Sequence, residues 1–306
     1  MTEPATADRL RRALALNQVE PDAETAGVDE VFEGISQWVP WPKAYGGDLV
    51  AQAAVAMMRT APADKTMHSM HSYFMRPVDI DAPVRYSVER VRDGRGYATR
   101  AVRGIQNGKE AYRAMASFHA CERGGSFAAS MPEVPAAGDL PSSQDYLDAV
   151  DASQDTGTMT PESREYWSTG RSFDMRHVPG PVYLTVDGGR QPHQAVWIRP
   201  FADLGQIAGL TEQQRDVAAL AYACDYTILE PVLRVLGHAW AEPGLVTASL
   251  DHAMWFHRPA AVNGWLLYAQ EAVAADAGRG LGLGRFFTAD GVHVATVAQE
   301  GMLRVP

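Results

Sequence analysis

The sequence lacks several features that would assign it to a particular class of protein. It has two cysteines in 306 residues, too few for a disulfide framework. It has fewer basic than acidic residues, 27 against 37, and the net charge of −10 argues against general binding to nucleic acid or to an anionic membrane. No apolar run reaches the roughly 18 residues of a membrane span, and the N-terminus lacks the apolar core of a secretory signal. We therefore expect a cytoplasmic protein.

The chain does contain enough apolar material for a sizeable core. Hydrophobic residues make up 46% of it and charged residues 21%, as in ordinary soluble globular proteins. A length of 306 residues favours about two domains.

The two halves of the sequence repeat one pattern. Phe74-Met-Arg-Pro77 recurs as Phe256-His-Arg-Pro259, at an offset of 259 − 77 = 182. Further matches follow in the same order at nearly the same offset: Tyr86 with Tyr268, Glu89 with Glu271, and Asn107-Gly108 with Asp290-Gly291. Because order and spacing persist, we interpret the chain as a duplication of one unit.

Each half is predicted to hold one buried helix and several antiparallel strands. Residues 49–58 are almost wholly apolar, as expected of a buried helix. Thr211 and Gln214 form a capping-box signature for a second helix, which reaches Asp225 and breaks at Pro231. Strands are expected at 31–39, 67–75, 83–92, 97–106, 110–120, 246–259, 265–275, 280–288 and 292–304. We predict an α+β fold of two antiparallel sheets, each wrapped round its helix.

The predicted division of the chain follows from this pattern. Residues 1–125 form the first unit, with a short helix at 6–16 in its N-terminal extension. Residues 126–160 are rich in Gly, Ser, Ala and Pro, which indicates a linker. Residues 161–306 form the second unit.

One stretch of the second unit, 246–259, alternates between apolar and polar residues and is predicted to be a half-buried strand. In such a strand Ser249 and Asp251 share one face. Asp251 and His252 face opposite ways and cannot form a dyad within a flat strand.

Several motifs resemble the acyl-CoA thioesterase II family. They include His68-Ser-Met-His-Ser-Tyr-Phe-Met-Arg-Pro77, Ser249-Leu-Asp-His-Ala-Met-Trp-Phe-His-Arg-Pro259, Tyr45-Gly-Gly47 and Val297-Ala-Gln299-Glu-Gly301. The resemblance implies a double hotdog fold and hydrolysis of acyl-CoA to free fatty acid and CoA, without a metal or an organic cofactor. It also implies a homodimer or homotetramer.

The family uses an Asp, a Thr or Ser, and a Gln to hold and activate a water, and by motif these fall on Asp225, Ser249 and Gln299. A buried carboxylate can accept a proton from water as a general base, while a hydroxyl and an amide orient that water. Backbone N–H groups at Gly46 and Gly47 are the candidate donors to the oxyanion.

The first copy does not repeat this trio. At the local offsets Asp225 matches Asp48, Ser249 matches Met67, and Gln299 matches Ala116. We therefore expect one catalytic centre per chain.

Some assignments stay open at the level of sequence. Arg90, Arg92 and Arg95 belong to the densest basic stretch, which either binds the CoA phosphates or is a solvated strand face. Cys224 is a candidate nucleophile, but without an activating His nearby in sequence a buried structural thiol is favoured. His68 and His71 point to opposite faces of a strand, which disfavours a metal site.

Two other functions compete with hydrolysis. A non-catalytic acyl-CoA or lipid-binding module would bind the thioester and release no thiol. An enoyl-thioester hydratase is ranked low, because that chemistry generally needs an Asp and a His on one helix, and no His follows Asp225 before His238.

Overall fold

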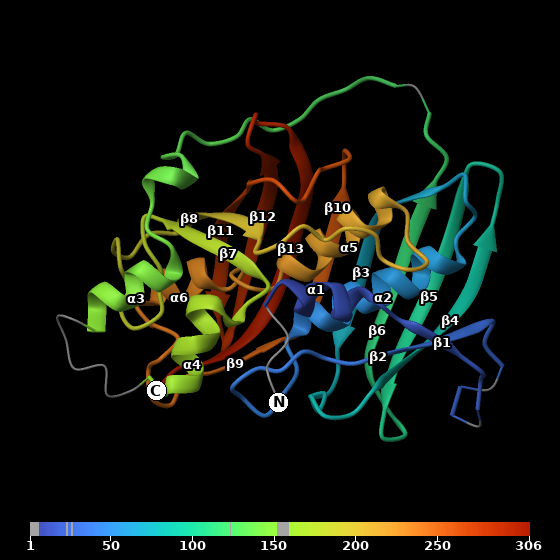
Figure 1. Ribbon diagram of the computed structural model, residues 1–306, viewed down its shortest axis with the longest axis horizontal. Helices are drawn as coiled ribbons and strands as arrows, with labels where there is room; N and C mark the ends of the chain where they lie inside the picture. Colours follow the sequence, from blue (N-terminus) through green and yellow to red (C-terminus); the bar gives the residue numbers. More distant parts are fainter. Residues whose placement is uncertain (1–5, 23, 26, 123, 152–158) are drawn as a thin grey trace.

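The computed structural model describes residues 6–22, 24–25, 27–122, 124–151 and 159–306. In this part of the chain, 13 strands form one antiparallel sheet, and helices α1, α2 and α5 lie in front of it in the view of Figure 1. The order of the strands is β1-β2-β4-β5-β6-β3-β10-β13-β12-β11-β8-β7, with β9 paired to β13.

The first half contributes two helices and six strands among the described residues. They are α1 (Thr6–Leu14), β1 (Asn17–Val19), β2 (Glu30–Gly34), α2 (Gly46–Thr60), β3 (Thr66–Phe74), β4 (Val84–Asp93), β5 (Tyr97–Gln106) and β6 (Lys109–His119).

The second half begins with short helices and then builds its own part of the sheet. Its elements are η1 (Ala137–Asp139), α3 (Ser143–Asp151), α4 (Pro161–Glu165), η2 (Tyr166–Gly170), β7 (Phe173–Val178), β8 (His193–Pro200), α5 (Glu212–Ala223), α6 (Glu230–Leu236), β9 (Val246–Ser249), β10 (Asp251–Phe256), β11 (Leu266–Asp276), β12 (Arg279–Thr288) and β13 (His293–Arg304).

Helix α2 is buried on all sides, as its apolar sequence predicts. Strands β4 and β5 cover one side, and α1 and α5 pack on the others. Four alanines, Ala51, Ala53, Ala54 and Ala56, are fully buried and leave room for these neighbours to approach closely. In the second half, Thr211 and Gln214 form the predicted capping box at the start of α5.

The duplication is visible where the two halves meet. Strands β3 and β10 pair at the centre of the sheet, so the two predicted sheets join edge to edge. His71 pairs directly with Ala253, which is its own counterpart in the repeat, since 253 − 182 = 71. Direct pairing of counterparts is what a pseudo-two-fold axis through this point produces.

The predicted strand at 31–39 is too long, because β2 ends at Gly34. Beyond it, side chains of α2 bind the backbone in place of a strand partner. Gln52 donates to the carbonyl of Ile35, and the amide of Gln37 donates to Asp48. These contacts divert residues 35–45 from the sheet toward the start of α2.

Residues 126–142 form a strap across the face of the sheet opposite the helices; this part of the green trace arches over the top of Figure 1. Met131, Val134, Ala137 and Leu140 pack there on outward side chains of β8, β11 and β12. Trp197 donates its indole N–H to the carbonyl of Pro135 at 2.9 Å. The predicted linker, residues 126–160, also contains η1 and α3, which a plain linker would not include. The division into 1–125, 126–160 and 161–306 remains our proposal.

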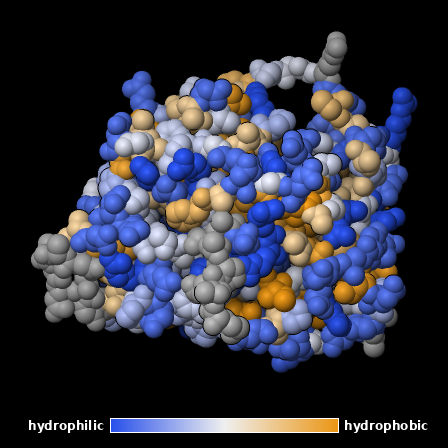
Figure 2. Space-filling model, in the orientation of Figure 1, coloured by the Kyte–Doolittle hydropathy of each residue, from blue (hydrophilic) through white to orange (hydrophobic). Residues whose placement is uncertain are grey.

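The surface facing the viewer in Figure 2 is mostly hydrophilic, with hydrophobic residues in separate groups. Across the described ranges, no helix combines the length and apolar character needed to cross a membrane.

Candidate active site

The three predicted catalytic side chains lie together. Asp225 follows the end of α5, Ser249 ends β9, and Gln299 lies in β13. The Ser249 hydroxyl donates to Asp225 Oδ1 at 3.0 Å, and Gln299 Nε2 donates to the same oxygen at 2.5 Å. Gln299 Nε2 also lies 3.0 Å from Ser249 Oγ. The three groups therefore form a closed hydrogen-bonded triangle.

A β-bulge places Ser249 in this triangle and corrects the predicted strand 246–259. Ser249 pairs with Gly301, whereas Ala253 pairs with Ala298, so Leu250 and Asp251 together oppose one residue of β13. An extra residue reverses the facing of every side chain beyond it. Ser249 and Asp251 therefore do not share a face, and the prediction that they do was wrong.

The N-terminus of α2 completes the site from the other half of the chain. The backbone N–H of Gly47 lies close enough to the Asp225 carboxyl group to favour its ionised form. A Cβ atom added at Gly46 would lie 2.5 Å from Asp225 Oδ2. Helix N-termini attract negative charge, so α2 is well placed to stabilise a carboxylate and charge that develops beside it.

The environment of Asp225 tunes its basicity. Burial raises the pKa of Asp225, while hydrogen bonds from Gln299, Ser249 and the Gly47 amide, together with the charge of Lys43, oppose that rise. Asp225 and Ser249 remain partly exposed, whereas Gln299 is only 1% exposed. A carboxyl group that is both accessible and raised in pKa suits proton transfer.

The side-chain oxygen of Gln299 takes no part in the triangle. Its Oε1 atom is buried and has no hydrogen-bond partner among the described residues. A buried acceptor without a partner costs free energy, so a water or substrate group that donates to Oε1 would be held well there.

Asp48, the counterpart of Asp225 in the repeat, is fully buried in α2. Its Oδ2 accepts from the Gln37 amide at 3.0 Å, and its Oδ1 lacks a partner within the described ranges. Burial raises the pKa of Asp48 to about 7. The matching residues Met67 and Ala116 are buried and apolar, so the first copy has no equivalent polar triangle on these positions.

The raised pKa of Asp48 predicts a pH-dependent gain in stability for Asp48→Asn. Because the folded state favours the protonated carboxyl, its contribution to stability is full below pH 3.8 and is lost as pH rises toward about 7. Asparagine stays neutral at all pH values. We expect Asp48→Asn to raise the free energy of unfolding at about pH 8 by as much as about 4 kcal/mol, and to change it little near pH 4. Urea unfolding at both pH values tests this, and an equal difference at both would contradict it.

A contact that sequence reasoning missed joins Cys224 to His252. The Sγ and Nε2 atoms lie 3.2 Å apart, and both residues are buried. The bulge turns His252 inward, which sequence spacing does not reveal. Burial raises the pKa of the thiol well above its usual range and lowers that of the imidazole to about 3. Both groups are therefore neutral, and the predicted buried thiol at Cys224 is confirmed.

Arg90, Arg92 and Arg95 are not brought to the triangle. They are exposed near the turn between β4 and β5, where Arg100 donates to the carbonyl of Thr60 at the end of α2. The triangle lies at the opposite end of α2, and 15 helical residues span about 22 Å. Within one chain, these arginines therefore lie on a solvated part of the strand and its turn, away from the triangle.

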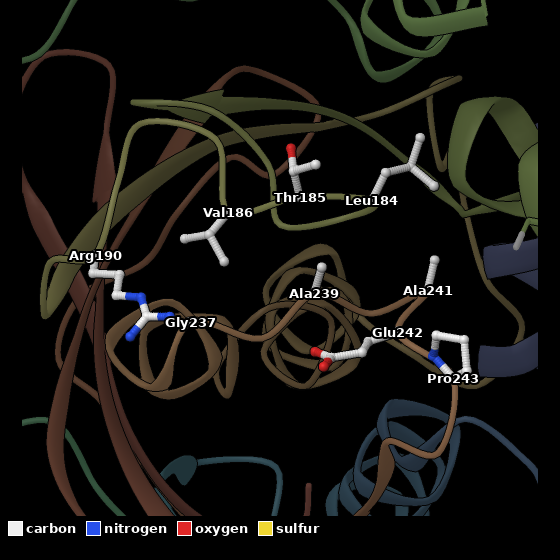
Figure 3. Close-up of a pocket in the computed structure, with 9 residues that line it drawn as sticks. All are labelled: Leu184, Thr185, Val186, Arg190, Gly237, Ala239, Ala241, Glu242 and Pro243. Carbon is white, nitrogen blue, oxygen red and sulfur yellow. The ribbon is translucent and has the colours of Figure 1, made fainter. Parts of the chain in front are cut away.

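One further feature lies apart from the triangle. A surface cavity of about 530 Å³ is lined by residues of 184–190 and 237–243, with Arg190 and Glu242 on opposite sides of it (Figure 3).

Within the described ranges, no group of three or more His, Cys, Asp or Glu side chains has an arrangement suited to a metal ion.

Two family models match the chain in order. The acyl-CoA thioesterase N-terminal domain matches residues 35–119, and the acyl-CoA thioesterase C-terminal domain matches residues 141–303. The first includes Gly46 and Gly47, and the second includes all three members of the triangle.

Curated relatives and solved structures agree with these matches. The chain is 33% identical to acyl-CoA thioesterase 2 of Haemophilus influenzae, over 90% of this chain and 93% of that protein. It is 32% identical to human acyl-coenzyme A thioesterase 8, over 90% and 85%. A crystal structure of an acyl-CoA thioesterase II from Mycobacterium marinum superimposes with a TM-score of 0.74 and 31% identity, covering 97% and 98% of the two chains.

The fold itself recurs in more distant structures. A protein with a hot dog fold from Alicyclobacillus acidocaldarius superimposes with a TM-score of 0.72 at 20% identity, covering 99% of this chain and 100% of that one. The predicted double hotdog fold is confirmed.

Proposed function

The chain belongs to the acyl-CoA thioesterase II family and is a thioester hydrolase, and we propose that Asp225, Ser249 and Gln299 activate its water. One observation carries the proposal. Ser249 and Gln299 both donate to the same carboxylate oxygen, beside the N-terminus of α2. This arrangement leaves Asp225 Oδ2 and Gln299 Oε1 to contact a water.

In the proposed reaction, Asp225 takes a proton from a water that Gln299 Oε1 holds by accepting its other hydrogen. The water oxygen attacks the thioester carbonyl carbon, and negative charge moves to the carbonyl oxygen. When the tetrahedral intermediate collapses, the carbon–sulfur bond breaks and Asp225 returns the proton to the CoA sulfur. General base catalysis of this kind contributes on the order of a hundredfold to ten-thousandfold.

We assign the oxyanion to the N-terminus of α2, with one change to the sequence-based assignment. The Gly47 N–H lies beside the Asp225 carboxyl group and opposes the rise in its pKa, so we propose the Gly46 N–H as the donor to the oxyanion. The partial positive charge at the helix end adds to that hydrogen bond.

The substrate class that we propose is acyl-CoA, as the names of the relatives indicate. Cytoplasmic location and assembly as a homodimer or homotetramer remain our proposals. Release of free thiol from short, medium and long acyl-CoA tests the function directly. Tight binding without thiol release would favour the lipid-binding alternative, and hydration of an enoyl-CoA would favour the hydratase.

Ser249 provides a matched pair of variants. We expect Ser249→Thr to retain turnover within about threefold, because the hydroxyl that donates to Asp225 is kept. We expect Ser249→Ala to lose roughly tenfold or more, because the hydroxyl that orients the Asp225 carboxylate is removed. Steady-state thiol release compares the two. Equal rates in both variants would show that the hydroxyl has no role in the reaction.

A further inference from the structure

Phe74 borders the hydrolytic site from the first half of the chain. It is the last residue of β3, and its side chain is partly exposed. A point one bond from the Gly46 Cα atom, where a Cβ would be, lies 2.5 Å from Asp225 Oδ2 and 3.1 Å from Cε1 of the Phe74 ring. The edge of this ring and the oxygen of the proposed base therefore flank the same glycine.

Two contacts fix the position of Phe74. Its backbone N–H donates to the carbonyl of Leu250 at 2.9 Å, which ties the end of β3 to the bulge beside Ser249. Its ring packs edge-on against the ring of Tyr112, with centroids 5.1 Å apart. Because Tyr112 is fully buried, the space behind the Phe74 ring is already filled, and the ring cannot withdraw from the site.

The apolar character of this wall favours the acyl part of the substrate over the CoA part. Phe74 and Tyr112 belong to the main hydrophobic core, where a hydrocarbon group gains by leaving water and a charged or polar group loses. In the reaction proposed above, the thioester carbonyl oxygen accepts from the Gly46 N–H, so the carbonyl carbon lies next to that glycine. The atom beside the ring is then carbon 2 of the acyl group, which is bonded to the carbonyl carbon.

We propose that Phe74 is a specificity-determining residue, whose ring contacts carbon 2 of the acyl group and makes the enzyme prefer acyl-CoA that is unbranched at this carbon. A methyl group on carbon 2 would approach the ring more closely than the roughly 3.5 Å of an ordinary carbon–carbon contact. This inference rests on the hydrolytic site proposed above, and it narrows the substrate from acyl-CoA in general to one class of acyl-CoA.

The test compares two substrates in each variant: an unbranched acyl-CoA of the chain length that the wild type hydrolyses fastest, and its 2-methyl derivative. The quantity measured is kcat/KM for the branched substrate divided by kcat/KM for the unbranched one. This ratio does not depend on the fraction of active protein, so a loss of stability alone does not move it. We expect Phe74→Ala to raise the ratio roughly tenfold, which is the effect of one methyl group in a tight apolar pocket. Phe74→Leu, the milder change to the core, should raise it by a smaller factor.

The duplication supplies a matched control. Phe256 is the counterpart of Phe74, since 256 − 182 = 74, and it ends β10 as Phe74 ends β3. It is also partly buried against the same core. Phe256→Ala therefore removes an equal ring from the corresponding place in the other copy, and it should leave the ratio at its wild-type value.

Each other outcome decides against the proposal. If Phe74→Ala changes kcat/KM by the same factor for both substrates, the ring only supports the fold or excludes water. If Phe256→Ala raises the ratio as much as Phe74→Ala does, the effect is a general loosening of the core. If Asp225→Asn is inactive and Phe74→Ala keeps the wild-type ratio, this inference fails while the hydrolytic site stands; if Asp225→Asn is fully active, the proposed site itself fails.

Discussion

Asp225→Asn should lower kcat by on the order of a hundredfold or more without unfolding the protein. The amide keeps the shape of the carboxyl group but cannot accept a proton from water, so the contribution of general base catalysis is lost. Folding should survive, because burial disfavours a charge at this position and a neutral amide avoids that penalty. Thiol release from an acyl-CoA, measured from about pH 6 to 9, gives the rate.

Two further measurements on this variant serve as controls: its thermal stability and its KM. Thermal unfolding should match the wild type within a few degrees, and KM should change little, since Asp225 acts on the water and not on the acyl chain. Turnover at the wild-type rate would remove Asp225 from the mechanism, whatever its position in the triangle.

Gly46→Ala should be the second most damaging change, with kcat reduced by roughly a hundredfold. The added Cβ would lie 2.5 Å from Asp225 Oδ2 and 3.1 Å from a ring carbon of Phe74, so the carboxyl group must move. Misplacing a reacting group by about 1 Å costs about this factor. Gly46 is not among the glycines with positive φ, so backbone strain does not confuse the result.

Gly138→Ala is the matched control, because its Cβ would meet nothing within 4 Å. It should leave turnover and stability unchanged. Gly47 is a poorer test than Gly46, since a Cβ there would lie 2.3 Å from the backbone carbonyl of Tyr222 and disturb the fold itself. If Gly46→Ala hydrolyses acyl-CoA normally, the start of α2 has no close role in the reaction.

Local sequence patterns were sufficient to predict most of the sheet. The expected strands 83–92, 97–106 and 110–120 correspond to β4, β5 and β6 within one residue at each end. Alternating burial and the Asn107-Gly108 turn, with φ of 53° and 70°, are properties of short stretches and can be read from them.

Features that depend on distant contacts could not be predicted in this way. The bulge at Leu250 is held by β3 and β13, since the Phe74 amide donates to the Leu250 carbonyl and the Leu250 amide donates to that of Glu300. The strap 126–142 is ordered by outward side chains of β8 and β11 that follow it in the chain. No local signal in either stretch identifies these partners.

The candidate site shows the same limit. Its three polar side chains were found through motifs, and Gly46 and Gly47 were predicted as donors to the oxyanion. The approach of Gly47 to Asp225, 178 residues later in the chain (225 − 47 = 178), was not predicted. The role of Arg90, Arg92 and Arg95 was left open for a related reason, since a dense basic run in the sequence gives the charge of a segment and not its distance from the triangle. Their exposure is a tertiary property.

The contribution of α2 to the site of the second copy has a consequence for how such a chain can change. The first copy lacks the reactive groups but supplies a helix end on which the other copy depends. The first copy cannot accept substitutions freely, because a side chain added at Gly46 would displace Asp225 in the second copy. The two halves of the chain are therefore no longer equivalent: the second half carries the reactive side chains, and the first half supplies a helix end that the site needs.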